Sequence, residues 1–361
     1  MLWRAQIGLI GSVPSMPDVD PRDARAVADA VRGWAADRFA SAVEVVGAPT
    51  AAGAGFDSYV HFVELAGSGL PAAWRAPLVV RILPSADRSE QARTEAAVQE
   101  WAATRGYDAP HVLEVLMPGD LFDRPAQVMQ RAPGVLMLDA LKARPWRAFA
   151  LADRLAQLHL ALHRIEPTGW PGPGDTAALA AKRLSLPRRA VAQLDDRALA
   201  AALERAEALV ADGVGSPEVV VCHGDFHPLN VLVDGPRSSV IDWTDAGLAP
   251  READVSRTAL LFQVAAVAAT GRLERALLAR AGPALSRRYR RTYERGAPLD
   301  AGLMARWEGL HALHGWAQVE MLHAGAFELE SSSAGNEARV PRALGQWLRA
   351  RFESALSNQG L

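Results

Sequence analysis

The hydrophobic pattern of the chain changes near residue 131. Before that point, apolar runs of strand length alternate with two helical patterns; the predicted strands are 43–46, 59–65, 77–83, 111–117 and 126–130, and the helices 23–39 and 89–105. Beyond it, helical patterns dominate, at 147–165, 176–212, 253–269, 300–327 and 341–356. The sequence therefore predicts an α+β protein, with an antiparallel sheet and helices in its N-terminal part and a larger, mainly helical C-terminal part. The turn at 131–134 is the predicted boundary.

One stretch interrupts the helical half. Residues 219–243 are predicted as strand, loop, strand, turn and strand, because short β-branched runs flank the polar positions. His223, Asp225, His227 and Asn230 cluster in the loop. Strands hold polar groups rigidly between them, and rigid placement is what a catalytic site needs. This stretch is the leading candidate for the functional site.

Composition narrows the class of protein. The 361 residues favour two domains, and the net charge of −2 leaves no basic excess for binding nucleic acid. Cys222 is the one cysteine, so internal disulfides and multi-cysteine zinc sites are excluded, and a reducing cytoplasm fits best. The longest apolar run, 259–269, is too short to cross a bilayer, and residues 1–13 lack a clear signal-peptide pattern. We expect a cytoplasmic protein without a membrane partner.

The loop has the spacing of a kinase catalytic loop, His223-x-Asp225-x4-Asn230. In that chemistry Asp225 accepts the proton of an acceptor hydroxyl or orients that hydroxyl. Asn230 and Asp242, which ends the next strand, supply oxygen ligands to Mg²⁺. A hydrolytic metal site built on the histidines leaves Asn230 without a role, and a nucleophilic Cys222 conflicts with its place in an apolar strand.

Two features of the N-terminal part suit an anionic ligand. Gly53 to Ser58 forms a small-residue hairpin whose backbone N–H groups can approach phosphates, although an ordinary glycine-rich hairpin also explains it. Arg81 lies within an apolar strand, and a buried arginine needs a partner. Glu95, near the apolar face of the following helix, is a candidate; the alternative places Arg81 at a strand edge, facing solvent.

Other candidates have plain structural explanations that we favour. His159 and His163 stand four residues apart on a helix, which suits a metal, but no acidic or cysteine partner is near in sequence, so packing is preferred. The basic segment 272–295 is typical of a solvated helix face. Trp307 and Trp316 recur at helical spacing among leucines, which favours a core position over a pocket wall.

The motifs resemble those of the aminoglycoside phosphotransferase family, the choline-kinase-like branch of the protein-kinase fold. Its His-Gly-Asp-x4-Asn pattern matches His223 to Asn230, and its Ile-Asp-Trp/Phe metal motif matches Ile241 to Trp243. The resemblance implies a two-lobed fold, with a nucleotide-binding N-lobe at 1–131 and a catalytic, acceptor-binding C-lobe at 132–361. It also implies roles for further residues: Gly53, Gly55 and Ser58 in the nucleotide loop, Arg81 with Glu95 at the phosphates, Met129 and Gln130 at the adenine, and His223 and Asp245 in support.

The implied function is a Mg²⁺-dependent transfer of phosphate from ATP or GTP to a hydroxyl of a small molecule. Arg81 departs from the family pattern, which has lysine there, so the choice of nucleotide stays open. Other readings are a nucleotide-binding protein without turnover, a sugar or metabolite kinase unrelated to resistance, and a metal-dependent hydrolase. The sequence does not identify the acceptor. Acidic residues at 320, 328 and 330 favour a cationic acceptor, whereas the basic segment 272–295 disfavours one.

Overall fold

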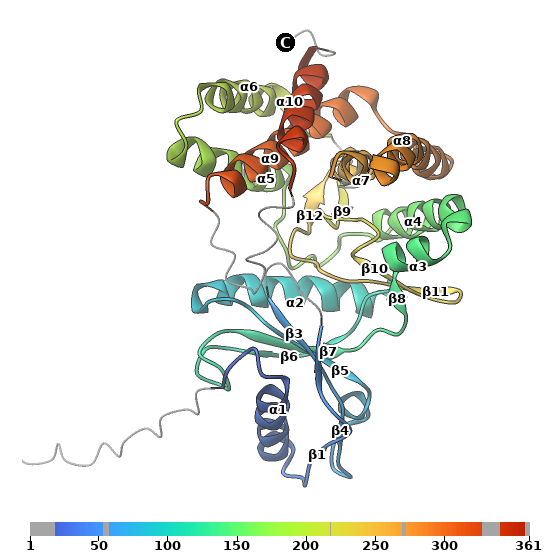
Figure 1. Ribbon diagram of the computed structural model, residues 1–361. Helices are drawn as coiled ribbons and strands as arrows, with labels where there is room; N and C mark the ends of the chain where they lie inside the picture. Colours follow the sequence, from blue (N-terminus) through green and yellow to red (C-terminus); the bar gives the residue numbers. More distant parts are fainter. Residues whose placement is uncertain (1–18, 53–57, 217, 269–271, 327–339, 358–361) are drawn as a thin grey trace, which may run out of the picture. The chain divides into compact units, whose positions relative to one another are not determined.

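The computed structural model describes residues 19–52, 58–216, 218–268, 272–326 and 340–357 (Figure 1). Within these ranges the chain forms two compact units. The first comprises Met1–Ala92 with Leu113–Arg131, and the second Arg93–Val112 with Ala132–Leu361. Residue 131 therefore ends the last segment of the first unit, whereas 93–112 join the second unit. The nucleotide-binding and acceptor-binding roles expected for 1–131 and 132–361 stay predictions.

The first unit is built on a five-stranded sheet. Its strand order is β2-β3-β5-β7-β6, formed by β2 (Thr50–Ala51), β3 (Tyr59–Val63), β5 (Leu78–Ile82), β7 (Ala126–Gln130) and β6 (Val112–Leu116). The pairs β2–β3, β3–β5 and β5–β7 are antiparallel, as expected. The short strands β1 (Glu44–Val45) and β4 (Leu65–Ala66) form a separate pair. The expected strand at 59–65 is thus divided into β3 and β4.

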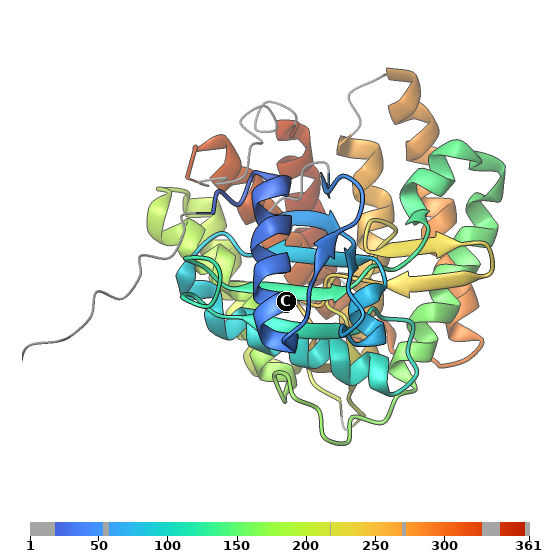
Figure 2. The same cartoon turned by 90° about the horizontal axis from the view of Figure 1, so that it is seen from below.

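Helix α1 (Ala24–Phe39) covers one face of this sheet (Figure 2). Asp23 caps it by accepting the backbone N–H groups of Arg25 and Ala26. Val27 and Val31 of the helix share one apolar cluster with Leu78 and Val80 of β5. The helical periodicity of the sequence therefore identifies the face that is buried.

Most of the second unit is helical. Its helices are the C-terminal part of α2 (Ser89–Thr104), α3 (Met137–Ala143), α4 (Ala148–His163), α5 (Thr176–Gln193), α6 (Arg197–Gly213), α7 (Arg251–Ala268), α8 (Arg272–Glu294), α9 (Ala301–His323) and α10 (Arg342–Ser357). The helical pattern expected at 176–212 forms two helices, α5 and α6, and Asp196 caps α6 by accepting the backbone N–H groups of Ala198 and Leu199. Trp307 and Trp316 are buried in the core cluster, which confirms the preferred interpretation. None of the helices in the described ranges combines the length and hydropathy needed to span a membrane.

Two small sheets stand among these helices. One has the order β11-β10-β8, from β11 (Arg237–Val240), β10 (Val231–Asp234) and β8 (Val135–Leu136); the other pairs β12 (Gly247–Ala249) with β9 (Val220–Cys222). The sequence predicts β9, β10 and β11 but not β8 or β12, which are only two and three residues long. The antiparallel sheet of the first unit and the mainly helical second unit confirm the predicted fold class.

Candidate active site

The loop between β9 and β10 carries the candidate catalytic groups, and apolar strands hold it at both ends. Val221 and Cys222 of β9 and Val231 of β10 are fully buried. Burial also raises the pKa of the Cys222 thiol well above its ordinary value, so this side chain is a small core residue and not a nucleophile. The loop 223–230, which carries the polar candidates, is therefore held at both ends by core packing.

Both carboxylate oxygens of Asp225 have partners. Oδ1 accepts from Nε and Nη2 of Arg257 at 2.8 and 2.6 Å, and Oδ2 lies 3.1 Å from Nε2 of His227. Although burial opposes it, the charge of Arg257 and the contact with His227 lower the pKa of Asp225 well below its usual value. Asp225 is therefore an anion held in one orientation.

Asn230 and Asp242 lie at neighbouring strand ends. Nδ2 of Asn230 donates to the backbone oxygen of Asp225 at 3.0 Å, and the backbone oxygen of Asn230 accepts the N–H of Ile241 at 3.0 Å. Asp242 follows Ile241 directly and has the left-handed φ of +64°, an uncommon conformation that is frequent at functional sites. Carboxylate and amide oxygens are the hard donors that Mg²⁺ takes, so this pair fits the metal that the sequence predicts.

His223 joins the two strand ends. Its Nε2 lies 3.1 Å from the backbone oxygen of Ile241, and its Nδ1 accepts the N–H of Asp225 at 3.3 Å. This pattern requires a neutral ring with the proton on Nε2, in agreement with a pKa lowered by burial. Because both ring nitrogens bind backbone groups, His223 supports the loop and is not a metal ligand, which argues against the hydrolytic alternative.

Gly224 and Asp245 are tightly packed against each other. Gly224 has φ +80°, and a Cβ at this position would lie 2.2 Å from the backbone oxygen of Asp245, so only glycine fits. The carboxylate of Asp245 binds Nη1 of Arg183 at 2.8 Å and Nζ of Lys182 at 2.9 Å. Nη2 of Arg183 in turn donates to the backbone oxygen of Gly224 at 2.5 Å. Asp245 thus supports the loop through the cations of α5.

The carboxylate of Asp254, on α7, binds the backbone at the start of the loop. Its Oδ2 accepts the N–H of His223 at 2.6 Å, and its Oδ1 accepts the N–H of Gly224 at 2.9 Å. Nε2 of His159 and of His163 lie 2.9 and 3.4 Å from the same Oδ2. Although burial opposes it, the two imidazoles lower the pKa of this carboxyl well below its usual value. Asp254 is therefore a buried anion that orders the backbone beside Asp225.

The two histidines of α4 have the acidic partner that the sequence lacks nearby. Nδ1 of His159 lies 2.5 Å from the hydroxyl of Tyr289, and Nδ1 of His163 lies 2.6 Å from that of Tyr293. The ligand atoms of the two histidines and Asp254 lie within 4.8 Å of one another, as in a metal site. Each of them is already hydrogen-bonded, and Asp254 also binds two backbone amides, so we interpret the group as a buried hydrogen-bond network.

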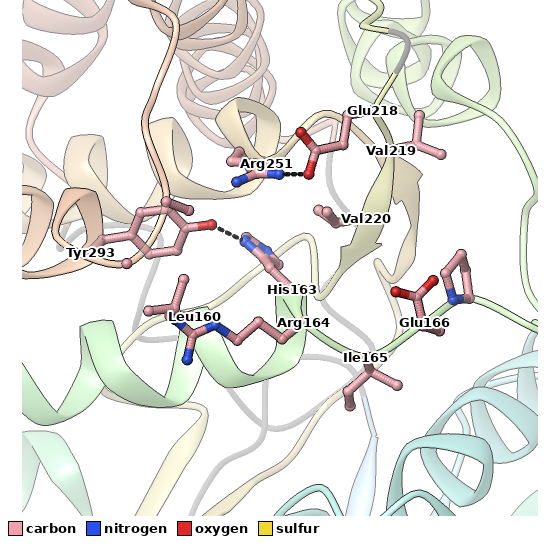
Figure 3. A pocket seen from close by; sticks show the side chains of 13 residues that line it. Leu160, His163, Arg164, Ile165, Glu166, Glu218, Val219, Val220, Arg251 and Tyr293 are labelled. Atoms are coloured by element: carbon pink, nitrogen blue, oxygen red, sulfur yellow. Dashed lines mark hydrogen bonds and ion pairs between the residues drawn. The ribbon is translucent and has the colours of Figure 1, made fainter.

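A pocket of about 320 Å³ adjoins this network (Figure 3). It lies at the C-terminal ends of α4 and α8, beside the start of β9 and of α7, and His163 and Tyr293 face it. Arg251 and Glu218 form an ion pair on its wall. Neither Asp225 nor the expected metal ligands line it, but His163 on its wall contacts Asp254, and Val220 belongs to the strand that leads into the candidate loop.

The candidate nucleotide residues of the first unit lie on and beside β5 and β7. Nε of Arg81, which is half-buried on β5, donates to Oγ of Ser58 at 3.0 Å. Met129 and Gln130 end β7, where Gln130 pairs with Leu78. Gly53 and Gly55 lie outside the described residues. Glu95 is buried and belongs to the second unit, so its pairing with Arg81 stays a prediction.

Arg257, Arg183 and Asp254 were not among the sequence candidates. Asp254 and Arg257 lie on α7, more than 20 residues after Asn230, and Arg183 lies on α5, 40 residues before His223, so nothing in the loop motif points to them. The sequence does hold a clue for two of them. Asp254 and Arg257 are charged residues three positions apart on a largely apolar helix, so they lie on the same helix face.

The chain is similar to several known phosphotransferases. An aminoglycoside 3'-phosphotransferase of Streptomyces fradiae is 28% identical over 221 residues, 58% of this chain and 78% of that protein. A thermostable variant of aminoglycoside phosphotransferase APH(4)-Ia, solved with AMP-PNP and hygromycin B, has a TM-score of 0.58 at 15% identity, over 91% of this chain and 98% of its own. The macrolide 2'-phosphotransferase of Brachybacterium faecium has a TM-score of 0.53 at 18% identity, over 87% and 99%.

These structures share the protein-kinase-like fold with the chain, as the sequence predicts. A family model described as the phosphotransferase enzyme family matches residues 50–299, a range that contains the sheet of the first unit and the catalytic loop of the second. The match covers more than half of the chain. The chain therefore belongs to the phosphotransferase enzyme family.

Proposed function

We propose that this protein transfers the γ-phosphoryl group of ATP or GTP to a hydroxyl of a small molecule. The observation that carries the proposal is the loop geometry: Asp225 and Asn230 are hydrogen-bonded to each other, and Asp242 follows the residue that binds Asn230. The arrangement supports a role for Asp225 as a fixed carboxylate, with Asn230 and Asp242 as oxygen ligands. Phosphoryl transfer needs those parts and little covalent chemistry from the protein.

In this proposal each residue has a defined task. Asp225 binds and orients the acceptor hydroxyl and takes its proton, while Asn230 and Asp242 hold Mg²⁺. The metal, when bound, neutralises charge on the phosphates. Arg81 contributes a positive charge to the nucleotide, and its bond to Ser58 fixes the direction of its guanidinium.

The remaining assignments follow the same division. Met129 and Gln130, at the end of β7, are proposed to bind the base, and Glu95 to pair with Arg81. His223 and Asp245 keep the loop in place without contacting substrate. Small-molecule antibiotics are the first acceptors to consider, because the relatives and structural neighbours include proteins that act on aminoglycosides and macrolides and one solved with hygromycin B.

The test is nucleotide turnover. ADP or GDP release is measured with Mg²⁺, each nucleotide and a panel of hydroxyl compounds, for the natural protein and Asp225→Asn. We expect acceptor-dependent release that falls by at least about a hundredfold in the variant, since loss of a positioned acid–base group typically costs that much. Thermal stabilisation by Mg·ATP without release would instead favour a binding protein, and equal release by the variant would refute the role of Asp225.

A further inference from the structure

Arg257 lies directly against the proposed base. Its Nε and Nη2 both reach Oδ1 of Asp225, at 2.8 and 2.6 Å, while His227 approaches Oδ2 at 3.1 Å. The side chains of Arg257 and Asp225 are 17% and 27% exposed, so the contact is partly shielded from solvent. The two guanidinium donors fix the position of Oδ1, and the contact of His227 with Oδ2 then fixes the rotation of the carboxylate.

The carboxylates around the proposed base already have partners within the protein. Asp225 is paired with Arg257, and the neighbouring carboxylate, Asp245, is paired with both Lys182 and Arg183. Asp254, also beside the loop, is already bound by two histidines and two backbone amides, and Asp242 is assigned to the metal in the proposed function. An ammonium group brought to Asp225 would meet the guanidinium of Arg257 on the same oxygen.

We propose that Arg257 is a positioning residue that also sets acceptor specificity: it orients Asp225 and selects a hydroxyl compound that carries no positive charge beside the reacting hydroxyl. This inference rests on the proposed function and narrows it to neutral or negatively charged acceptors. Like-charge contacts discriminate strongly at partly buried sites, because neither charge can be fully solvated there. Lys182 and Arg183 act in the same sense by neutralising Asp245.

The two roles of Arg257 can be separated with two substitutions. Arg257→Gln removes the charge and the fork, whereas Arg257→Lys keeps the charge and loses the fork. Arg251→Gln is the matched control, because it removes the same charge from the same helix and its partner, Glu218, is largely exposed. The compounds are uridine and chloramphenicol (uncharged), pantothenate (anionic) and neomycin (polycationic), each with Mg·ATP and ADP release as the readout.

The expected result has three parts. The natural protein and Arg251→Gln show higher kcat/KM for the uncharged or anionic compounds than for neomycin. Arg257→Gln lowers kcat by about tenfold or more and shifts the ratio of kcat/KM values toward neomycin by about tenfold or more. Arg257→Lys keeps the natural ratio but not the natural kcat, since selectivity follows charge and rate follows orientation.

Two results would overturn the inference: preference of the natural protein for neomycin, or a ratio that Arg257→Gln changes by less than about twofold. Absence of ADP release with every compound would instead refute the proposed function, and the acceptor class with it. The positioning role is then still decided by unfolding of Asp225→Asn, Arg257→Gln and the double variant. We expect their effects on the unfolding equilibrium constant to be coupled by about tenfold, and additive effects would refute the contact.

Discussion

The strongest prediction concerns Asp254, which holds the catalytic loop from inside the core. In Asp254→Asn the shape is kept, but one of the two oxygens becomes an N–H donor. The least harmful orientation places the new amide at Oδ1, where it faces the N–H of Gly224, because Oδ2 accepts from three donors: His223, His159 and His163. The variant therefore loses the hydrogen bond from the N–H of Gly224, and its three bonds at Oδ2 no longer have a charged acceptor.

The magnitude follows from these contacts. A buried donor without an acceptor costs about 1–3 kcal/mol, and three hydrogen bonds that lose their ionic character weaken by roughly 1 kcal/mol each. The lower cost of burying a neutral amide offsets part of this loss. We expect the free energy of unfolding to fall by about 3 kcal/mol, within the range found when buried polar networks are broken. Since the same amides fix the backbone beside Asp225, kcat should fall by at least about tenfold.

The assay is urea unfolding together with ADP release, measured at a temperature where the variant is folded. Glu252→Gln is the control, because Glu252 is buried on the same helix and accepts the N–H of Asp300 at 2.9 Å without touching the loop. This control should lose about 1 kcal/mol and keep its kcat. If Asp254→Asn stays folded with the kcat of the natural protein, or loses less than about 1 kcal/mol, the two amides do not depend on this carboxylate and the reasoning is wrong.

Three further predictions use the same measurements. Gly224→Ala places a Cβ 2.2 Å from the backbone oxygen of Asp245 in a left-handed conformation, so it should lower the free energy of unfolding by about 2 kcal/mol or more and abolish most ADP release. Gly235→Ala is the control: its φ is +54° but the space around it is open, so it should cost only about 1 kcal/mol. Burial lowers the pKa of His163 from 6.5 to about 4, so between these pH values the unfolded chain binds more protons than the folded protein. The free energy of unfolding therefore falls as the pH decreases below 6.5, by about 2 kcal/mol at pH 5. Urea unfolding of His163→Asn should show a smaller difference between pH 7 and pH 5 than the natural protein does. Asp196→Ala removes the N-cap of α6 and should cost about 1 kcal/mol by urea unfolding without changing kcat.

The sequence predicts the fold class because each element carries its own pattern. Buried Val27 and Val31 recur at helical spacing, and β5 alternates between buried and half-buried positions. The short strands β8 and β12 escape prediction because two or three residues are too few for any period to appear. They form because β10 and β9, which are predicted from β-branched runs, offer them hydrogen bonds.

The site divides in the same way. Asp225, Asn230 and Asp242 can be proposed from sequence because they lie close together along the chain in a recognisable motif. Arg257 and Asp254 are not, because tertiary folding brings α7 to the loop and a single charge on an apolar helix has many explanations. His159 and His163 show the same limit: their acidic partner lies more than 90 residues away, so the spacing of the pair alone indicates neither a metal nor a network.

The proposed reaction type and the proposed acceptor preference depend on different parts of the chain. The groups proposed to perform the reaction lie on one loop and directly after the following strands, so a short motif is enough to propose the reaction type. The cations that set the charge around the base come from α5 and α7. If the proposed function is right, we expect substitutions on those helices to change which acceptor is used while the reaction stays the same. Two proteins with the same loop can differ in acceptor, and the contacts of Asp225 and Asp245 are where that difference should be sought.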